Sequence, residues 1–327
     1  MKLFNKIEIN KSQIKKWSII GSRATFGLVL TEIADEIDNL IVLSGDVSTS
    51  AGLDKFRKIH KEKYLEMGIA EQNMLGVAAG LASEHYNVIT TSFAPFQTMR
   101  CCEQIKVNGG YMKNKIIMVG LASGLTLGNL GYTHCCVEDI GVLRSIPNLT
   151  ILSPCDPFEL VKCLEYSIKH INGPTYIRLT GSTNQKIFIE EDYEFKIGKN
   201  ELLVSGKDVV IYSTGAIINE VIAASDILKD HGISASIINV STIKPFNGEE
   251  IFEQIKNYKL VVSVEEHNVL GGLGSAISEC RSKLGTPKKH LILGVNDKYS
   301  NAGSYNYLKN YFGIDAQSIA KKILLNL

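Results

Sequence analysis

One carboxylate stands out in the stretch EMGIAEQNMLGVAAGLA, residues 66–82. Glu71 lies among glycine, alanine and branched apolar residues, and no obvious basic partner follows it. The stretch is typical of a helix, and a glutamate in the first turn complements the helix dipole by about 0.3–1 kcal/mol. The alternative is that Glu71 lies in an apolar pocket, where a carboxyl group can exchange protons with a ligand.

Three further residues have side chains suited to binding a flat, polar ligand. Phe93 and Phe96 lie in SFAPF, and His134 lies in GYTH. Aromatic rings gain dispersion and stacking energy against a planar ligand, and histidine exchanges protons near neutral pH. Each also has a structural interpretation, because phenylalanine commonly fills cores and a single histidine beside two cysteines is commonly structural.

Short apolar runs alternate with longer helical patterns through the first half of the chain. The runs include NLIVLSGDV, YNVITTSFAPF, KNKIIMVGLA, NLTILSPC and GPTYIRLT. This alternation is typical of a parallel sheet covered by helices. Asp46 follows the first run and is therefore expected at the carboxyl edge of the sheet, where ligands gather. It could instead cap a helix or a turn.

A polar, charged passage over residues 184–199 is interpreted as a linker. Beyond it, KDVVIYSTG, ISASIINV, KLVVSVEE and HLILGVN repeat the strand pattern, with helical spacing after the first. We therefore expect an α/β protein with two consecutive open domains and mainly parallel sheets. The first domain is expected over 1–183, with an N-terminal extension of about 1–17, and a smaller one over 200–327.

The composition argues against several classes of partner. Lysine plus arginine number 35 and aspartate plus glutamate 34, so no net field would attract nucleic acid or an anionic membrane. The seven cysteines form no Cys-x-x-Cys pair, which indicates reduced thiols in a cytoplasm. No apolar run of about 18 residues and no secretion signal is found. We expect a small-molecule or protein partner and no membrane.

Four stretches, in this order, resemble those of a known family: YLEMGIAEQNMLGVAAGLA, TTSFAPFQ, GYTHCCVEDIGVLRSIPNLTILSPCDP and VEEHNVLGGLGSAI. Together they resemble the transketolase family over most of the chain. The resemblance implies a pyrimidine-binding domain followed by a transketolase C-terminal domain, which form the second half of a full-length transketolase. It also implies a cytoplasmic enzyme of carbohydrate metabolism with thiamine diphosphate as its cofactor.

The resemblance implies a role for each candidate residue. Glu71 would hydrogen-bond a ring nitrogen of the aminopyrimidine and share a proton with it, which activates the cofactor's reactive carbon. Phe93 and Phe96 would line the pyrimidine pocket, and Asp46 would face the cofactor. His134 would point at the substrate and exchange protons or hydrogen bonds with its oxygens.

The resemblance leaves the substrate open. Arg23, Ser50 and Arg178 lie near positions that hold the substrate phosphate in members acting on sugar phosphates, where an arginine fork can make two bonds. Each could equally be a surface ion-pair residue. Leu130 stands where the family has an aspartate that grips a sugar hydroxyl, and Ala122 where it has a histidine near the substrate.

Two other features have open interpretations. His267, in EEHNVLGG, is expected to have a structural or interface role, and GGLG after it could bind an anion or form a packing turn. Gly76, Ala79, Gly80 and Ala82 give the helix after Glu71 a small-residue spacing. This spacing would suit either close approach of a second subunit or tight core packing.

The leading hypothesis is the C-terminal subunit of a two-component transketolase-like transferase, which moves a two-carbon ketol unit from a ketose to an aldehyde. The sequence has SGDV at 44–47 but no Gly-Asp-Gly, the segment through which the family binds Mg²⁺ and diphosphate. We therefore expect an N-terminal subunit to bind both, in an α2β2 heterotetramer in which this chain pairs with itself.

Three alternatives remain. The first is the β subunit of a 2-oxoacid decarboxylating enzyme, and the second is a deoxyxylulose-phosphate-synthase-like enzyme that uses pyruvate. Leu130 gives these two some weight, because an apolar side chain cannot bond a sugar hydroxyl. The third is a non-catalytic regulatory subunit, which the joint presence of Glu71, Phe96 and His134 argues against.

Overall fold

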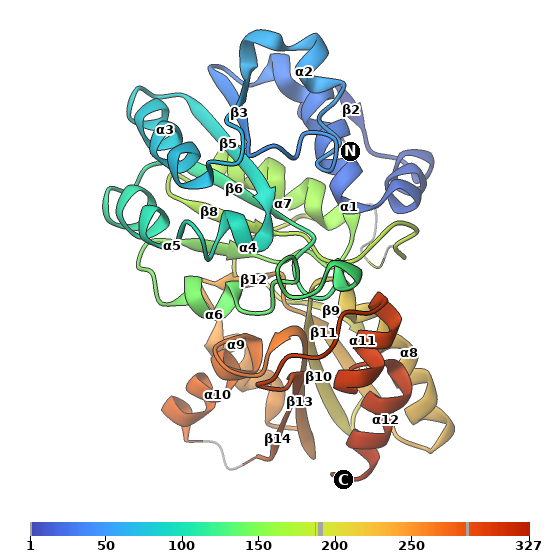
Figure 1. The fold of residues 1–327 in the computed structure, drawn as a ribbon. Helices are drawn as coiled ribbons and strands as arrows, with labels where there is room; N and C mark the ends of the chain where they lie inside the picture. Colours follow the sequence, from blue (N-terminus) through green and yellow to red (C-terminus); the bar gives the residue numbers. More distant parts are fainter. Residues whose placement is uncertain (1, 187, 189–191, 286–287) are drawn as a thin grey trace.

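The chain folds into two α/β units, which lie one above the other in Figure 1. The computed structural model describes residues 2–186, 188, 192–285 and 288–327. A seven-stranded sheet forms the centre of the first unit and a five-stranded sheet the centre of the second. Both sheets are mainly parallel. The expected α/β class is therefore confirmed.

The first sheet is parallel except at one edge. In spatial order its strands are β12 (Thr242–Lys244), β7 (Thr150–Leu152), β8 (Thr175–Arg178), β6 (Ile116–Leu121), β5 (Asn87–Phe93), β3 (Leu40–Ser44) and β4 (Tyr64–Glu66). Strand β12 comes from the second half of the chain and runs antiparallel to β7, so it ties the two units together. Ser44 of β3 pairs with Thr91 of β5. Residues that follow these two therefore emerge at the same carboxyl edge.

Helices cover both faces of this sheet (Figure 1). They are α1 (Lys11–Ile33), α2 (Phe56–Ile59), α3 (Glu71–Ser83), α4 (Ala94–Gln97), α5 (Cys102–Gln104), a π-helical segment (Ile105–Tyr111), α6 (Asp139–Arg144) and α7 (Pro157–His170). Helix α7 begins with Asp156 as N-cap and Pro157 at its first position, an arrangement that favours helix initiation. Trp17 of α1 is fully buried and stacks on Phe158 of α7. Residues 11–17, expected to belong to an extension, thus form part of this helix.

A short hairpin precedes α1, with strands β1 (Lys2–Leu3) and β2 (Ile7–Glu8).

The second sheet has the order β14 (His290–Val295), β13 (Leu260–Asn268), β10 (Val209–Thr214), β11 (Ala235–Asn239) and β9 (Glu201–Val204). Its helices are α8 (Ile218–Asp230), α9 (Gly248–Ile255), α10 (Leu273–Leu284), α11 (Tyr305–Phe312) and α12 (Ala316–Leu324). Only the edge strand β9 runs antiparallel within this described sheet.

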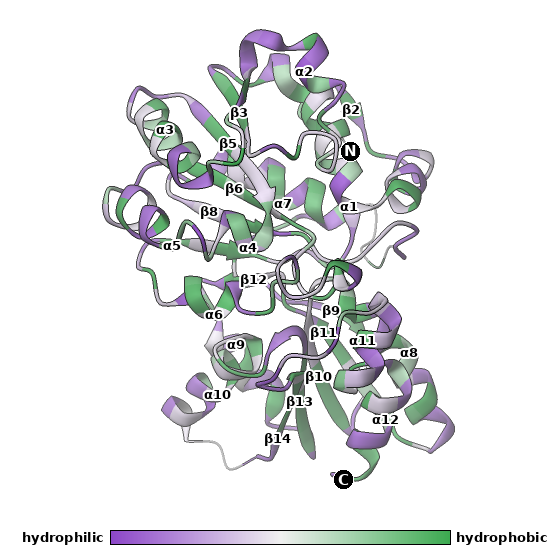
Figure 2. Ribbon diagram, viewed as in Figure 1, coloured by the Kyte–Doolittle hydropathy of each residue, from purple (hydrophilic) through white to green (hydrophobic). Residues whose placement is uncertain are grey.

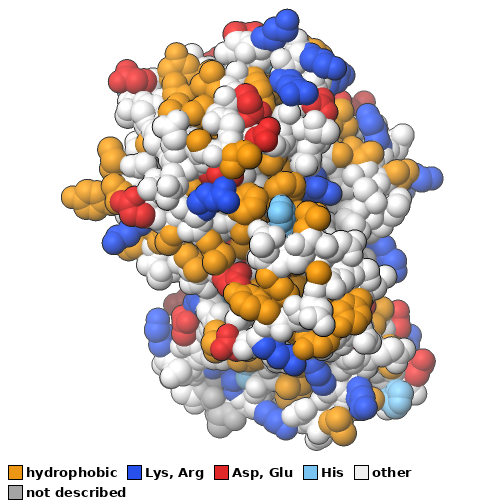
Figure 3. All heavy atoms as spheres, in the orientation of Figure 1, with side chains coloured by type: hydrophobic (Ala, Val, Ile, Leu, Met, Phe, Trp, Pro, Cys, Tyr) orange, Lys and Arg blue, Asp and Glu red, His pale blue; other side chains and the backbone are white. Residues whose placement is uncertain are grey.

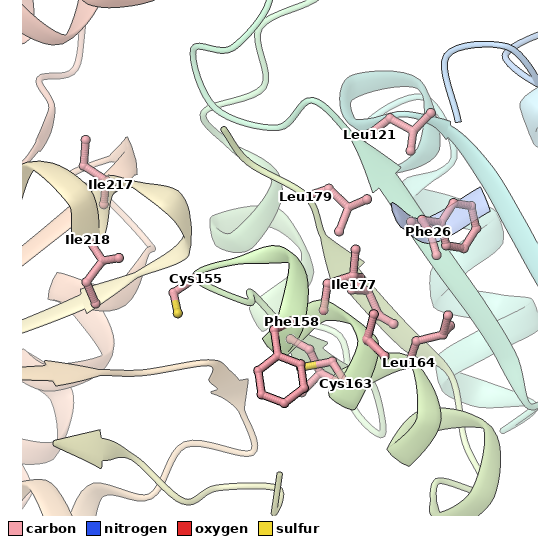
Figure 4. Close-up of a cluster of buried hydrophobic side chains, with 14 of the residues drawn as sticks. Phe26, Leu121, Cys155, Phe158, Cys163, Leu164, Ile177, Leu179, Ile217 and Ile218 are labelled. Carbon is pink, nitrogen blue, oxygen red and sulfur yellow. The ribbon is translucent and has the colours of Figure 1, made fainter. Parts of the chain in front are cut away.

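Apolar side chains concentrate on the strands and on the helix faces that meet them (Figure 2). One buried cluster continues from the first unit into the second. Figure 4 shows part of it, with Phe158 and Leu164 of α7 on one side and Ile217 and Ile218 on the other. Because the core is shared, the units are held in a fixed relation.

The expected linker over residues 184–199 lies beside the first unit where it is described. Gln185 contacts α1: its side chain accepts hydrogen bonds from the backbone N–H and hydroxyl of Ser22, at 3.1 and 2.8 Å. Positions 187 and 189–191 of the expected linker lie outside the described residues.

Candidate active site

Glu71 is the first residue of α3, and its side chain is 2% exposed. The hydroxyl of Ser92, near the end of β5, donates a hydrogen bond to Glu71 Oε1 at 3.3 Å. Gly45 follows β3, and a Cβ at this position would come within 3.1 Å of Glu71 Cγ. The carboxylate is thus enclosed at the carboxyl edge of the sheet, between residues that follow or end two neighbouring strands.

Phe93, Phe96 and His134 form an aromatic cluster. The imidazole ring centre lies 5.9 Å from that of Phe93 and 5.4 Å from that of Phe96, and both contacts are edge-to-face. The two phenylalanine rings are themselves 6.4 Å apart and edge-on. This is the geometry that aromatic pairs favour. All three side chains are half-buried, so the cluster retains an accessible surface.

Arg100 connects Glu71 to this cluster. Its Nη1 lies 2.7 Å from Glu71 Oε2, and its guanidinium carbon lies 4.1 Å from the centre of the Phe96 ring. The expectation that Glu71 lacks a basic partner is therefore wrong. Arg100 lies 29 positions after Glu71 in the sequence, and the turn after α4 brings it close to the carboxylate. The residues next to Glu71 therefore give no sign of this partner.

Asp46 lies at the same edge of the sheet, immediately after Gly45. Its side chain is exposed and its backbone has a φ of 58°, in the left-handed region. The Asp46 N–H donates to the carboxylate of Glu66 at 2.8 Å, and Tyr64 donates to the same carboxylate at 2.6 Å. Glu66 therefore fixes the turn while leaving the Asp46 side chain open to a ligand.

Arg23 and Ser50 lie on adjoining segments and are both half-buried. The loop after β3 packs against α1 so closely that a Cβ on Gly52 would lie 3.0 Å from Ala24 Cα and 3.3 Å from the Arg23 carbonyl oxygen. Burial lowers the pKa of the Arg23 guanidinium. A partly desolvated guanidinium of this kind gains more from an anionic partner than an exposed one does.

Arg178 does not join these two residues. It is fully buried, its Nε lies 2.9 Å from Asp139 Oδ2, and its Nη2 donates to the Glu266 carbonyl oxygen at 2.7 Å. Tyr176 donates to the same aspartate at 2.8 Å. The structure therefore gives Arg178 a place in an internal ion pair instead of the expected contact with a substrate phosphate.

The internal pair has perturbed ionisation. Burial alone would raise the pKa of Asp139, but the charge of Arg178 and the hydrogen bonds from Tyr176 and Arg178 outweigh it, and the pKa is lowered. Burial opposes the charge on Arg178, whereas Asp139 favours it, and the pKa of Arg178 is raised. Sequence analysis did not identify Asp139, because an acidic residue in a helix gives no sign of its buried partner.

His134 belongs to the loop between β6 and α6, residues 122–138, which we call the His134 loop. Two backbone hydrogen bonds between Gly124 and Cys136, at 2.7 and 3.0 Å, close the loop at its base. Thr133 Oγ1 lies 3.0 Å from His134 Nδ1. Leu130 is 55% exposed near the tip, whereas Ala122 is buried at the start.

His267 lies where the two units meet. It is fully buried, its Nε2 accepts a hydrogen bond from the Gly141 N–H at 3.1 Å, and its Nδ1 donates to the Asn268 carbonyl at 2.7 Å. The start of α10, which could have bound an external anion or formed a packing turn, binds the protein's own Glu265, which accepts hydrogen bonds from the N–H groups of Leu273 and Gly274 at 2.7 and 2.8 Å. Both features are therefore structural in this chain.

Two negative findings apply to the described residues. They contain no group of three or more histidine, cysteine, aspartate and glutamate side chains that could hold a metal ion. None of their helices is both long enough and apolar enough to cross a bilayer.

Known families and proteins resemble the chain over most of its length. The family "Transketolase, pyrimidine binding domain" matches residues 19–185, and "Transketolase, C-terminal domain" matches residues 198–319. A putative transketolase C-terminal section from Methanocaldococcus jannaschii is 38% identical over 93% of this chain and 95% of its own length. A 6-deoxy-6-sulfo-D-fructose transketolase subunit from Clostridium sp. is 35% identical over 91% and 92%.

A solved structure agrees with these relatives. The split-gene transketolase described as an inactive β4 tetramer superposes with a TM-score of 0.82 and 30% identity, over 92% of this chain and 96% of that one. Both family matches, two long relatives and the fold thus agree, and the chain belongs to the transketolase family, with its pyrimidine-binding and C-terminal domains.

Proposed function

We propose that this chain is the pyrimidine-binding subunit of a two-component transketolase-like transferase that moves a two-carbon ketol unit from a ketose to an aldehyde. The observation that carries this proposal is the buried Glu71 carboxylate, which Arg100 links to the ring cluster of Phe93, Phe96 and His134. A non-catalytic subunit would have no need to keep a buried acid, an aromatic wall and an imidazole together.

The residues fit the aminopyrimidine of thiamine diphosphate. A planar ring with polar edges needs an apolar wall for its face and a carboxyl group that can share a proton with its ring nitrogen. Phe96 supplies the wall, and Glu71 supplies the carboxyl group. When bound, thiamine diphosphate would supply the carbon nucleophile for the carbon–carbon chemistry.

The other residues have roles that follow from their positions. Glu71 holds and shares a proton at the ring nitrogen, and Phe93 lines the pyrimidine pocket beside Phe96. His134 exchanges a proton or a hydrogen bond with an oxygen of the substrate. Asp46, exposed beside Gly45, faces the cofactor from the end of β3.

Arg23 and Ser50 are the candidates for binding an anionic group of the substrate. The partial burial of Arg23 supports this assignment, because desolvation strengthens its attraction for an anion. One relative is named for 6-deoxy-6-sulfo-D-fructose, a sugar with an anionic substituent. We therefore propose a phosphorylated or similarly charged sugar as the substrate class.

We assign the magnesium ion and the diphosphate to a separate N-terminal subunit. Magnesium takes oxygen ligands in near-octahedral geometry, often from one or two carboxylates with phosphate and water. The family supplies these through a Gly-Asp-Gly segment, which the sequence does not contain. We propose an α2β2 heterotetramer in the cytoplasm; the seven unpaired cysteines support that location.

We propose that this chain pairs with itself through α3 and the π-helical segment. Ile69, Tyr111 and Met112 are 77%, 82% and 56% exposed there, and Figure 3 shows hydrophobic side chains gathered at this edge of the molecule. A Cβ on Gly76 or Gly80 of α3 would meet nothing within 4 Å in the single chain. The exposed apolar surface supports burial against a second copy.

Gly76→Leu tests the pairing, because the single chain has room for the new side chain. We expect a monomeric chain by light scattering at a concentration where the wild type is dimeric or larger. The matched control is Asp226→Leu, at an exposed position of α8 in the second unit, which should leave the assembly unchanged. Equal assembly of Gly76→Leu and wild type would contradict self-pairing through α3.

Product analysis of the assembled enzyme tests the activity. We expect transfer of a hydroxylated two-carbon unit from a ketose phosphate or hydroxypyruvate to an aldehyde, with no reaction from pyruvate. The exposed Leu130 favours the two alternatives that use a 2-oxoacid, because it offers no hydrogen bond to a sugar hydroxyl. Efficient condensation or decarboxylation of pyruvate would therefore contradict our proposal and support one of these two alternatives.

A further inference from the structure

The second unit holds the His134 loop along its length. At the start of the loop, Glu266 of β13 accepts a hydrogen bond from the Leu125 N–H at 2.5 Å. The same carboxylate lies against the backbone of Gly124, where a Cβ would collide with it. On its other side, Tyr305 of α11 donates to Glu266 Oε2 at 2.6 Å. Glu266 is fully buried and links the loop to α11 through these hydrogen bonds.

The middle of the loop rests on the segment before α11. The Gly303 N–H donates to the Gly128 carbonyl at 3.0 Å. The rings of Tyr132 and Tyr299 have centres 4.6 Å apart, and the hydroxyls of Tyr132 and Ser300 are 3.1 Å apart. Tyr132 lies two positions before His134, so this contact acts on the part of the loop that carries the imidazole.

The far end of the loop is held by the second unit as well. The Asn268 N–H donates to the Val137 carbonyl at 2.7 Å, and the Tyr299 hydroxyl donates to Glu138 at 3.3 Å. From the first unit, the Ser123 N–H donates to the Leu179 carbonyl at 2.8 Å, beside the start of the loop. Between its closed base and His134, the loop is therefore tied to the second unit by the hydrogen bonds of Leu125, Gly128 and Tyr132, whereas the His134 ring contacts Phe93 and Phe96 of the first unit.

We propose that Glu266 and Tyr299 are positioning residues, which hold the His134 loop so that the imidazole faces the substrate. This proposal rests on the proposed role of His134, because neither residue needs to touch the reacting atoms. In this proposal the C-terminal domain orients a loop of the neighbouring domain, in addition to packing against that domain. Burial raises the pKa of Glu266, which agrees with a carboxyl whose role is confined to internal hydrogen bonds.

Two pairs of variants separate positioning from general stability. Glu266→Ala removes the acceptor for Leu125, whereas Glu266→Gln retains an amide oxygen that can accept the same hydrogen bond. Tyr299→Ala removes the ring that packs at an angle against Tyr132, whereas Tyr299→Phe keeps it. Tyr299 is 67% exposed, so its truncation opens no core cavity even if Glu266→Ala fails to fold.

Amide hydrogen exchange gives the readout that does not depend on activity. We expect exchange over residues 124–137 to be about tenfold faster or more in both alanine variants, because local opening follows lost contacts. The Gln and Phe variants should exchange at a rate near that of the wild type. Unchanged loop exchange in Tyr299→Ala would overturn the proposal, and so would equal acceleration throughout the chain.

Kinetics of the assembled enzyme supply the second readout. Both alanine variants should lower kcat/KM for substrate about tenfold, with thiamine diphosphate affinity unchanged within about twofold, because Glu71 and Phe96 lie outside the loop. A parallel fall in cofactor affinity would contradict positioning through His134. If the wild type transfers no two-carbon unit, the proposed function fails by itself, and hydrogen exchange still decides whether the second unit holds the loop.

Discussion

Arg100 Nη1 lies 2.7 Å from Glu71 Oε2, and the Arg100 guanidinium also covers the ring of Phe96. The two residues that we assign to the pyrimidine thus share one cationic neighbour. Glu71 is 2% exposed and the Arg100 side chain 40% exposed, so the pair joins a buried acid to a partly solvated base. Its strength should lie between those of surface and buried ion pairs.

We predict that Arg100→Met destabilises the isolated chain by about 1–3 kcal/mol, because it leaves a buried carboxylate without its charged partner. Chemical denaturation measures the free energy of unfolding. In the Glu71→Gln background the same Arg100→Met change should cost much less, since no buried charge remains to be compensated. An equal cost in both backgrounds would show that Arg100 acts by packing on Phe96 alone.

We predict that Glu71→Gln lowers turnover of the assembled enzyme at least about a hundredfold, the lower end of what a positioned acid–base group contributes. Glutamine can accept a hydrogen bond but cannot share a proton with the ring nitrogen. Steady-state kinetics checks the fall. Glu84→Gln, at an exposed position just after α3, is the matched control and should retain activity. Near-normal turnover of Glu71→Gln would return Glu71 to the helix-dipole interpretation.

We predict that His134→Ala impairs reaction with substrate more than it weakens cofactor binding. His134 contacts Phe93 and Phe96 edge-on, while Glu71, to which we assign the ring nitrogen, belongs to α3. Single-turnover kinetics and a cofactor titration separate the two effects. The expected fall in rate is about 10²–10⁴-fold for a lost acid–base group. A collapse of cofactor affinity with a normal rate of the remaining complex would assign His134 to the cofactor instead.

The buried pair of Asp139 and Arg178 gives a prediction about stability. Asp139→Leu or Arg178→Met alone should cost about 3–5 kcal/mol, because each leaves a buried charge unpaired. The double variant should recover much of this cost, and a double-mutant cycle of unfolding free energies measures the recovery. Additive costs would contradict a direct pair.

The same pair predicts a dependence on pH. The pKa of Asp139 is lowered in the folded chain. Its stabilisation is therefore present above the unfolded pKa of about 3.9. It is lost as pH falls through the lower folded pKa. Denaturation between about pH 2 and 5 should show this acid-sensitive component in the wild type. Persistence of the full component in the Asp139→Leu/Arg178→Met double variant would assign it to other carboxylates.

Much of the fold could be predicted because its strands are continuous apolar runs. The run LIVLS forms β3 and VVIYST forms β10, since parallel strands covered on both faces need apolar residues throughout. The short strands β4, β9 and β12 escaped prediction. Strand β12, with three residues, is defined by its pairing with β7 across the unit boundary, and no local pattern encodes such a contact.

The candidate site divides in a similar way. Glu71, Phe93 and Phe96 could be identified because they lie in short motifs within consecutive elements. Arg100 and Glu266 could not be identified, because the role of each depends on a partner that the fold brings close. Arg178 was predicted to bind a substrate phosphate because the resemblance places it near such a position, whereas its ion pair with Asp139 allows it to be fully buried.

The central claim is that this chain provides the pyrimidine half of a site whose diphosphate half lies on another subunit. The isolated chain would lack three or four charge-assisted contacts to the diphosphate and its metal, worth about 1.5–3 kcal/mol each. Their loss should weaken binding by on the order of 5 kcal/mol or more, which is three to four decades of affinity.

Isothermal titration with thiamine diphosphate and magnesium tests this claim most directly. The chain is titrated alone and after assembly with a transketolase subunit that carries Gly-Asp-Gly. We predict no tight binding and no turnover for the chain alone, and both properties after assembly. Micromolar binding together with transketolase activity in the absence of any second polypeptide would contradict the account.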